Sequence, residues 1–227
     1  MSQLALPLKL QDHAVFESFY ARGNEALLAE LHNLAEHEQG PGCYIWGAPA
    51  TGKTHLLQAV CALVGDSAVY LPLSEFVDAG PAVLDGLAAR RFVCLDDLQC
   101  IVGVGDWELA LFALLNQLLD VDGKLIVSAA ATPRDSDIGL ADLESRLSRL
   151  PVYHTRQLDD ESRISALQLR AGHRGLDLPD ETARFLLLRS RRDMNSLYQL
   201  LDRLDSESLV AKRRLTVPFV SEVLQRL

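Results

Sequence analysis

Eight consecutive residues have the types and spacing that bind phosphate. They are Gly47, Ala48, Pro49, Ala50, Thr51, Gly52, Lys53 and Thr54, and they fit the pattern GxxxxGK[ST]. Glycines let backbone N–H groups turn inward around phosphate oxygens, and the positive end of a following helix attracts the same charge. In this pattern the lysine reaches the terminal phosphates and the threonine hydroxyl can bind Mg²⁺. The segment therefore predicts a P-loop that binds a nucleotide with Mg²⁺.

Two neighbouring carboxylates form a second candidate for this chemistry. Asp96 and Asp97 directly follow the apolar run 92–95, which is typical of a buried strand. A carboxylate in this position can hold Mg²⁺, and the next can orient the attacking water. We expect Asp96 to face the metal, where it completes the metal site with Thr54, and Asp97 to face the water. The alternative is a strand that simply ends in acidic residues.

A third apolar run, 124–127, leads into Ser128, Ala129, Ala130 and Thr132. A nucleotide hydrolase is expected to place a polar side chain at the end of such a strand, where it orients water. The two alanines cannot do this, so Ser128 or Thr132 would have to supply the polar group.

The elements that must position these residues alternate along the first two thirds of the chain. Short apolar runs at 43–46, 68–73, 92–95 and 124–129 predict strands, and helical periodicity covers 24–38, 53–63, 82–89 and 107–119. This order predicts an α/β fold with a parallel sheet flanked by helices. After Pro151 every strong periodic stretch is helical, at 160–172, 179–189, 192–204 and 217–227. A small all-helical domain should therefore follow the α/β domain.

Composition narrows the classes of function. The chain has 227 residues, 48% of them hydrophobic, and a formal net charge of −9, which disfavours strong autonomous DNA binding. Basic clusters at 189–192 and 212–214 are better explained as solvated helix faces than as a nucleic-acid site. No apolar run is long enough to span a membrane. The four cysteines and six histidines lack the spacing of disulfide frameworks or zinc sites, so we expect buried, reduced thiols and no metal beyond Mg²⁺.

The combination of P-loop, acid-ended strand and trailing helical domain resembles the AAA+ ATPases, over about residues 11–227. Within that superfamily, segments 52–56, 95–99 and 142–147 resemble the replication initiator DnaA and its homologues. Segments 166–170, 174–179, 184–187 and 215–220 resemble the Hda family of DnaA regulators. DnaA continues into a DNA-reading domain after its helical lid, whereas this chain ends at Leu227, so it looks like a truncated paralogue.

The N-terminal tail carries a further resemblance to the Hda family. Residues Gln3, Leu4, Leu6, Pro7 and Leu8 are similar to the peptide that docks in an apolar groove of the DNA polymerase sliding clamp (beta subunit). The alternative is a disordered tail with incidental leucines. The resemblance implies three parts: a flexible clamp-binding tail at 1–10, an AAA+ nucleotide-binding domain at 11–156 and a helical lid domain at 157–227.

The resemblance also implies roles for single residues. Arg146 stands where AAA+ proteins place an arginine finger that acts in trans, with Arg149 as a competitor and a surface salt bridge as the alternative. His55 and Asn195 are expected at the nucleotide. Asn195 replaces the usual lid arginine, and this change, with the alanines after the third strand, implies that the chain's own ATPase is weak or absent.

The function that follows is regulatory. The resemblance implies a protein that binds ADP or ATP with Mg²⁺, docks on the DNA-loaded clamp and stimulates hydrolysis of DnaA-bound ATP, which prevents re-initiation of DNA replication. The expected partners are DnaA and the clamp, homo-oligomers stay open, and we expect a cytoplasmic, nucleoid- or replisome-associated protein without membrane contact. The alternative is an independent AAA+ ATPase that loads or remodels a helicase.

Overall fold

The structure is a computed structural model that describes residues 14–37, 40–190 and 193–226. These residues form two compact units. The first contains Gly23–Arg156 and the described residues up to Phe16; the second contains Glu17–Arg22 and the chain from Gln157 onward. Tyr20 packs against the core of the second unit, and Arg22 donates to the Ser162 hydroxyl at 3.4 Å. The sequence alone places residues 17–22 with the α/β domain.

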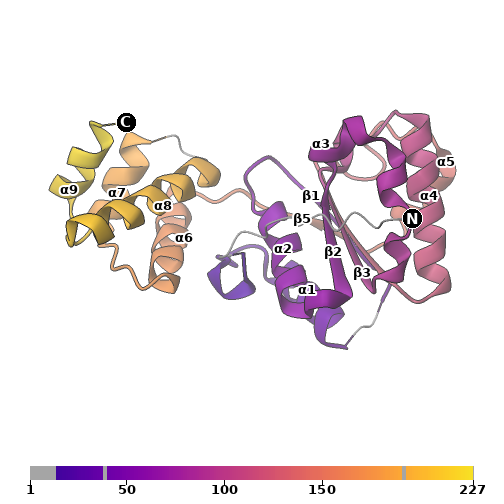
Figure 1. Ribbon diagram of the computed structural model, residues 1–227, viewed down its shortest axis with the longest axis horizontal. Helices are drawn as coiled ribbons and strands as arrows, with labels where there is room; N and C mark the ends of the chain where they lie inside the picture. Colours follow the sequence, from indigo (N-terminus) through magenta and orange to yellow (C-terminus); the bar gives the residue numbers. More distant parts are fainter. Residues whose placement is uncertain (1–13, 38–39, 191–192, 227) are drawn as a thin grey trace. The chain divides into compact units, whose positions relative to one another are not determined.

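A five-stranded parallel sheet organises the first unit (Figure 1). Its strands are β1 (Gly42–Trp46), β2 (Ala68–Pro72), β3 (Phe92–Asp96), β4 (Lys124–Ala129) and β5 (Val152–His154), in the order β2-β3-β4-β1-β5. All four neighbouring pairs are parallel. The carboxyl ends of β1, β3 and β4 therefore share one edge of the sheet, where the P-loop, Asp96 and Ser128 lie.

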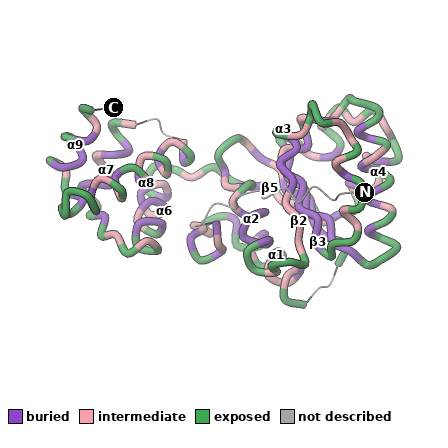
Figure 2. The backbone as a smooth tube through the Cα atoms, in the orientation of Figure 1, coloured by how far each residue is buried: buried purple, intermediate pink, exposed green. Residues whose placement is uncertain are grey.

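Helices cover both faces of this sheet (Figures 1 and 2). On one face lie α1 (Glu25–His37) and α2 (Lys53–Val64); on the other lie α3 (Leu73–Phe76), α4 (Gly105–Asp120) and α5 (Ala141–Leu147). Strands β1, β3 and β4 are apolar because both of their faces are buried. This arrangement confirms the predicted α/β fold.

One local expectation from the sequence is wrong, and one strand was missed. The predicted helix at 82–89 consists of two 3₁₀ turns, η4 (Pro81–Leu84) and η5 (Leu87–Ala89), because Gly86 adopts a φ of 77° between them. Strand β5 was not predicted. It has three residues and lies at the sheet edge with Val152 and His154 exposed, so its sequence carries little apolar signal. The remaining 3₁₀ turns are η1 (Phe16–Ser18), η2 (Gly65–Ser67), η3 (Val77–Ala79) and η6 (Leu98–Cys100).

The second unit is a helical bundle, as expected. It contains α6 (Asp160–His173), α7 (Asp180–Arg189), α8 (Met194–Ala211) and α9 (Val217–Leu224), which bury a core that includes Leu167, Leu186, Leu201 and Val220. Helix α6 begins where the Asp159 carboxylate accepts the backbone N–H of Ser162 at 2.8 Å, a typical N-cap.

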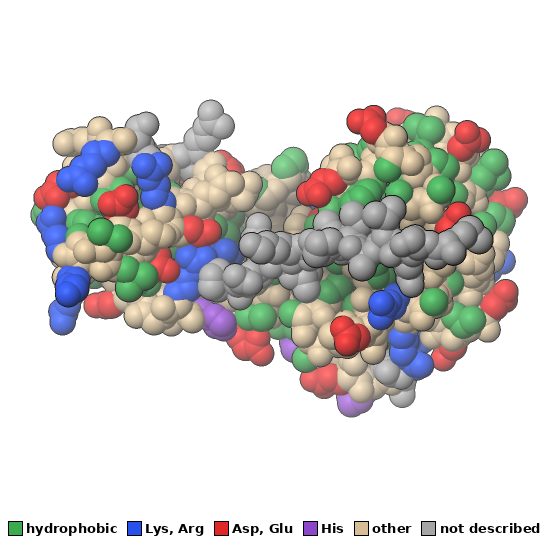
Figure 3. Space-filling model, in the orientation of Figure 1, with side chains coloured by type: hydrophobic (Ala, Val, Ile, Leu, Met, Phe, Trp, Pro, Cys, Tyr) green, Lys and Arg blue, Asp and Glu red, His purple; other side chains and the backbone are tan. Residues whose placement is uncertain are grey.

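Three further observations concern the length of the apolar helices, the burial of the cysteines and the distribution of charged side chains. No helix within the described ranges is long and apolar enough to cross a bilayer. Cys43, Cys61 and Cys94 are buried free thiols, and burial raises the pKa of Cys43, whereas Cys100 is partly exposed. Figure 3 shows basic side chains gathered on the visible face of the helical bundle, with acidic side chains scattered over both units.

Candidate nucleotide-binding site

The P-loop connects the end of β1 at Trp46 to the start of α2 at Lys53. Three of its residues have positive φ: Gly47 (155°), Ala50 (59°) and Gly52 (90°). Glycine adopts this backbone region without steric cost, whereas a side chain at Ala50 makes it strained. The left-handed Gly52 is the N-cap of α2, so the loop closes directly onto the positive end of a helix. This is the geometry that a phosphate cradle needs.

Thr155, the residue that follows β5, contacts the P-loop region at two points. The Thr155 N–H donates to the Trp46 carbonyl at 2.8 Å, and the Thr155 hydroxyl lies 2.7 Å from the Thr51 hydroxyl. A Cβ atom on Gly47 would come within 2.8 Å of the Thr155 carbonyl oxygen. Gly47 is therefore required by close packing as well as by its φ angle. Sequence reasoning missed Thr155 because the edge strand before it was not predicted.

Lys53 points back into the loop. Its ammonium donates to the carbonyl oxygens of Gly47 at 2.7 Å and Ala48 at 2.9 Å, and the residue is only 7% exposed. Burial lowers the pKa of Lys53, and the charges of Asp97 and Asp96 act in the opposite direction. Phosphate oxygens would bind this ammonium more strongly than neutral carbonyls do.

Asp96 is buried, at 2% exposure, and side chains from two other strands hold it. The Tyr70 hydroxyl on β2 donates to one carboxylate oxygen at 2.8 Å, and the Ser128 hydroxyl on β4 donates to the other. Burial, followed by the Asp96 charge, raises the pKa of Tyr70. Tyr70 was not predicted as a site residue. The register that pairs β2 with β3 could have suggested it, but that register exists only in the folded sheet.

Asp97 has a φ of 63° and turns the chain out of β3. Its N–H donates to the Ser128 hydroxyl at 2.9 Å, and its carboxylate accepts the Gln99 side-chain amide at 2.9 Å. Ser128 therefore bridges the two acidic residues. Of the two alternatives at this position, the structure brings Ser128 to the site, while Thr132 instead bonds Asp135. Ala129 contributes only its carbonyl, which accepts the Gly47 N–H at 3.2 Å.

These residues fit a nucleotide with Mg²⁺. Hard oxygen ligands suit Mg²⁺, and the site offers the Thr54 hydroxyl, which is exposed and unbonded among the described residues, and the carboxylates of Asp96 and Asp97. The expected geometry of the metal itself stays a prediction.

The described contact of His55 and the location of Asn195 both lie outside the P-loop. The His55 ring lies 2.9 Å from the Val15 carbonyl, so it attaches the segment before α1 to α2. Asn195 is exposed at the start of α8 in the second unit. Their predicted roles at the nucleotide stay predictions.

Arg146 lies near the end of α5. Leu143 and Leu147 bury the opposite side of this short helix in the core, which leaves Arg146 partly exposed. Arg149 follows the helix and is exposed. Within the described part of the chain, neither guanidinium makes an ion pair or hydrogen bond, so the surface salt bridge considered for Arg146 does not form there. The predicted clamp-binding residues 3–8 lie outside the described residues.

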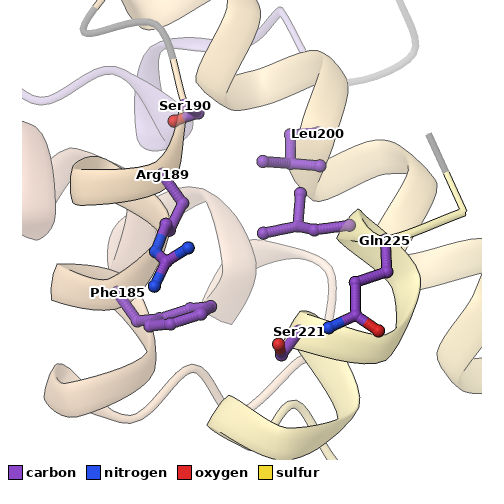
Figure 4. A pocket seen from close by; sticks show the side chains of 7 residues that line it. Phe185, Arg189, Ser190, Leu200, Ser221 and Gln225 are labelled. Atoms are coloured by element: carbon purple, nitrogen blue, oxygen red, sulfur yellow. The ribbon is translucent and has the colours of Figure 1, made fainter.

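The second unit has a pocket of about 650 Å³ between α7, α8 and α9 (Figure 4). Phe185, Arg189, Leu200 and Gln225 line it, and the Arg189 guanidinium lies 5.4 Å from the centre of the Phe185 ring. None of the residues predicted to bind phosphate contributes to this pocket.

Comparison with known proteins gives a family match for the second unit and a match of fold for most of the chain. Residues 160–224 match the family described as "Hda, lid domain". The chain is similar in fold to domain III of the replication initiation protein DnaA from Thermotoga maritima, with a TM-score of 0.80 and 20% identity over 96% of this chain and 98% of that one.

Two larger proteins share the fold. DnaA from Aquifex aeolicus bound to AMPPCP has a TM-score of 0.70 and 21% identity over 86% of this chain and 66% of its own. The Thermotoga maritima RuvB Holliday junction branch migration motor has a TM-score of 0.60 and 16% identity over 90% of this chain and 70% of its own. The chain therefore has the fold of DnaA domain III, with the P-loop at the carboxyl edge of the sheet, and its C-terminal helices match the family model of the Hda lid domain.

Proposed function

We propose that this protein is a nucleotide-bound regulatory partner of DnaA that stimulates hydrolysis of the ATP held by DnaA. The observation that carries the proposal is the Hda-type lid at residues 160–224, joined to an α/β unit with an intact phosphate cradle. The AMPPCP bound to Aquifex aeolicus DnaA supports ADP or ATP as the ligand of Lys53 and Thr54, and the proposal places Mg²⁺ with that nucleotide.

Arg146 supplies the chemistry in this proposal. A guanidinium that reaches the nucleotide of a neighbouring subunit stabilises the negative charge that develops on the transferred phosphoryl group. The absence of an ion pair at Arg146 among the described residues supports this role, because a guanidinium already held by a carboxylate would first have to leave it. Arg149 shares this property, so the two must be separated by experiment.

In this proposal the N-terminal segment determines where in the cell the protein acts. Gln3, Leu4, Leu6, Pro7 and Leu8 dock on the sliding clamp, which concentrates the protein at DNA where the clamp is loaded. The alternative function is an independent AAA+ ATPase that loads a helicase. One observation favours it: the Ser128 hydroxyl donates to the Asp96 carboxylate and accepts the Asp97 N–H, so the site keeps a polar side chain on β4 beside the end of β3.

The test is hydrolysis of DnaA-bound ATP with DNA-loaded clamp, measured with the wild-type chain, Arg146→Ala and Arg149→Ala. We expect wild-type stimulation, its loss by about 10³-fold or more in Arg146→Ala, and its retention in Arg149→Ala. Loss in Arg149→Ala alone would transfer the finger to that residue. No stimulation by the wild type, together with ATP hydrolysis by the chain alone, would favour the helicase-loader alternative.

Clamp docking is tested separately by retention of the chain on immobilised clamp. Gln3→Ala combined with Leu6→Ala should abolish retention while leaving nucleotide binding unchanged. Equal retention of both forms would contradict the assignment of residues 3–8 to the clamp.

A further inference from the structure

Glu108 is a buried carboxylate that none of the chemistry above uses. It lies in the first turns of α4, is 3% exposed and belongs to the first unit. A buried carboxylate costs much free energy unless hydrogen bonds compensate it. The hydrogen bonds that offset the cost of burying Glu108 therefore indicate which segments this side chain holds.

Backbone N–H groups from two separate loops converge on the Glu108 carboxylate. One oxygen accepts Gly103 N–H at 2.8 Å and Gly139 N–H at 3.0 Å, and the other accepts Leu140 N–H at 2.8 Å. Gly103 belongs to the loop that follows the acidic end of β3. Gly139 and Leu140 belong to the loop that leads into α5. One side chain thus ties the segment after Asp96 and Asp97 to the segment before Arg146.

The contact at Leu140 acts directly on α5. Leu140 is the N-cap residue of this helix, and its carbonyl accepts the N–H groups of Leu143 and Glu144 at 3.0 and 3.1 Å. No side chain caps the helix from within its own sequence. With only seven residues, α5 has little intrinsic stability. Its position therefore depends on the burial of Leu143 and Leu147 and on the hold of Glu108 at Leu140.

The Glu108 carboxylate leaves little room for a side chain at Gly139. A Cβ atom on Gly139 would lie 3.3 Å from a Glu108 carboxylate oxygen, a separation that would push the carboxylate by a few tenths of an ångström. A glycine at 139 lets the backbone approach the carboxylate closely enough for two adjacent N–H groups to donate.

We propose that Glu108 is a positioning residue that fixes the start of α5, and through it Arg146, relative to the loop that follows Asp96 and Asp97. The inference rests on the proposed function of Arg146. Glu108 does not touch the nucleotide in this proposal; it acts through the backbone of α5. Misplacement of a catalytic group by about 1 Å lowers a rate by about a hundredfold, so loss of this hold should reduce stimulation strongly without altering nucleotide binding.

The test uses the full chain and the variant Glu108→Gln, in which an amide replaces the carboxylate and sets an N–H donor against backbone N–H groups. The matched control is Glu144→Gln. It also removes one negative charge, from α5 and two residues from Arg146, and the acceptor of the Gly103, Gly139 and Leu140 N–H groups in the described structure is Glu108, not Glu144. Gly139→Ala is a second variant that keeps Glu108 and its charge.

Stimulation of DnaA-bound ATP hydrolysis is measured against the concentration of each variant. A positioning role lowers the plateau rate by about tenfold to a hundredfold in Glu108→Gln, with a smaller drop in Gly139→Ala and none in Glu144→Gln. A merely structural role reduces the folded fraction, which shifts the half-maximal concentration and leaves the plateau unchanged. In the Arg146→Ala background, Glu108→Gln should add no further loss. A wild-type plateau in both Glu108→Gln and Gly139→Ala, or an equal loss in the Arg146→Ala background, overturns the proposal.

Amide hydrogen exchange separates this proposal from the proposed function. Exchange at Gly139 and Leu140 should accelerate in Glu108→Gln and stay unchanged in Glu144→Gln, whether or not the chain acts on DnaA. If the wild type gives no stimulation, the function of Arg146 fails, and the exchange result alone decides whether Glu108 holds α5. Unchanged exchange at both amides in Glu108→Gln overturns the proposal independently of DnaA.

Discussion

Replacement of Tyr70 by phenylalanine tests the hydrogen-bond arrangement around Asp96. The substitution removes one hydroxyl that donates to the buried carboxylate at 2.8 Å and leaves the ring in place. Hydrogen bonds to charged groups contribute about 1.5–3 kcal/mol to stability. Because Asp96 keeps its bond from Ser128, we expect Tyr70→Phe to lower the free energy of unfolding by about 2 kcal/mol.

Tyr44→Phe is the matched comparison in the same sheet. Its hydroxyl donates to the neutral carbonyl of Ala131 at 3.1 Å, a contact that contributes about 1 kcal/mol. For a chain of this length, 1 kcal/mol corresponds to about 2–4 °C in Tm. Thermal unfolding followed by circular dichroism should therefore show a shift of about 4–8 °C for Tyr70→Phe and about half of that for Tyr44→Phe.

The pH dependence gives an independent check on the same contact. The pKa of Tyr70 is raised above its ordinary value of 10.0, chiefly by burial and then by the Asp96 charge. A raised pKa in the folded state means that the stabilisation is fully present below pH 10 and is lost as the pH rises above it. The stability difference between wild type and Tyr70→Phe should therefore be constant from pH 7 to 9 and shrink above pH 10.

Two results would refute this reasoning. Unfolding free energies of Tyr70→Phe and wild type that agree within about 0.5 kcal/mol would mean that the hydroxyl does not hold Asp96. A difference that grows above pH 10 would show that the tyrosine prefers its charged form in the folded protein, contrary to its place beside a carboxylate.

Two further predictions concern the P-loop. Gly47→Ala should lower stability by more than about 3 kcal/mol, because it combines a positive φ with a collision at Thr155; the control Gly103→Ala, with positive φ but open space, should cost about 1–2 kcal/mol, and equal urea-unfolding midpoints would contradict the role of Thr155. Lys53→Met should weaken binding of a fluorescent ADP by about tenfold to a hundredfold. It should not lower the stability of the protein, because it removes a buried ammonium group, and burial already disfavours the charged form of Lys53 and lowers its pKa. Lys212→Met, at the exposed end of α8, should leave ADP binding unchanged, and unaltered affinity in Lys53→Met would contradict phosphate binding by this lysine.

The local chemistry of the site could be predicted from the sequence because it depends on contiguous residues. The P-loop pattern from Gly47 to Thr54 places its own glycines, lysine and helix start within eight positions, so no distant contact is needed to recognise it. The alternation of apolar runs with helical periodicity likewise indicated the parallel sheet, since strands buried on both faces must be apolar throughout. The change to purely helical periodicity after Pro151 similarly indicated the bundle of α6 to α9.

The tertiary structure decided the contacts that join distant segments. Tyr70, Ser128 and Thr155 reach the site only because β2, β4 and β5 pair with neighbouring strands in a particular register. The sequence left Ser128 and Thr132 as alternatives, and the register of β4 selected Ser128. Glu108 resembles any surface carboxylate of an amphipathic helix until folding buries it against two loops. Contiguous residues and their periodicity determined the cradle and the fold class, whereas the supports of the cradle depend on strand register and burial, which arise only when the whole chain packs.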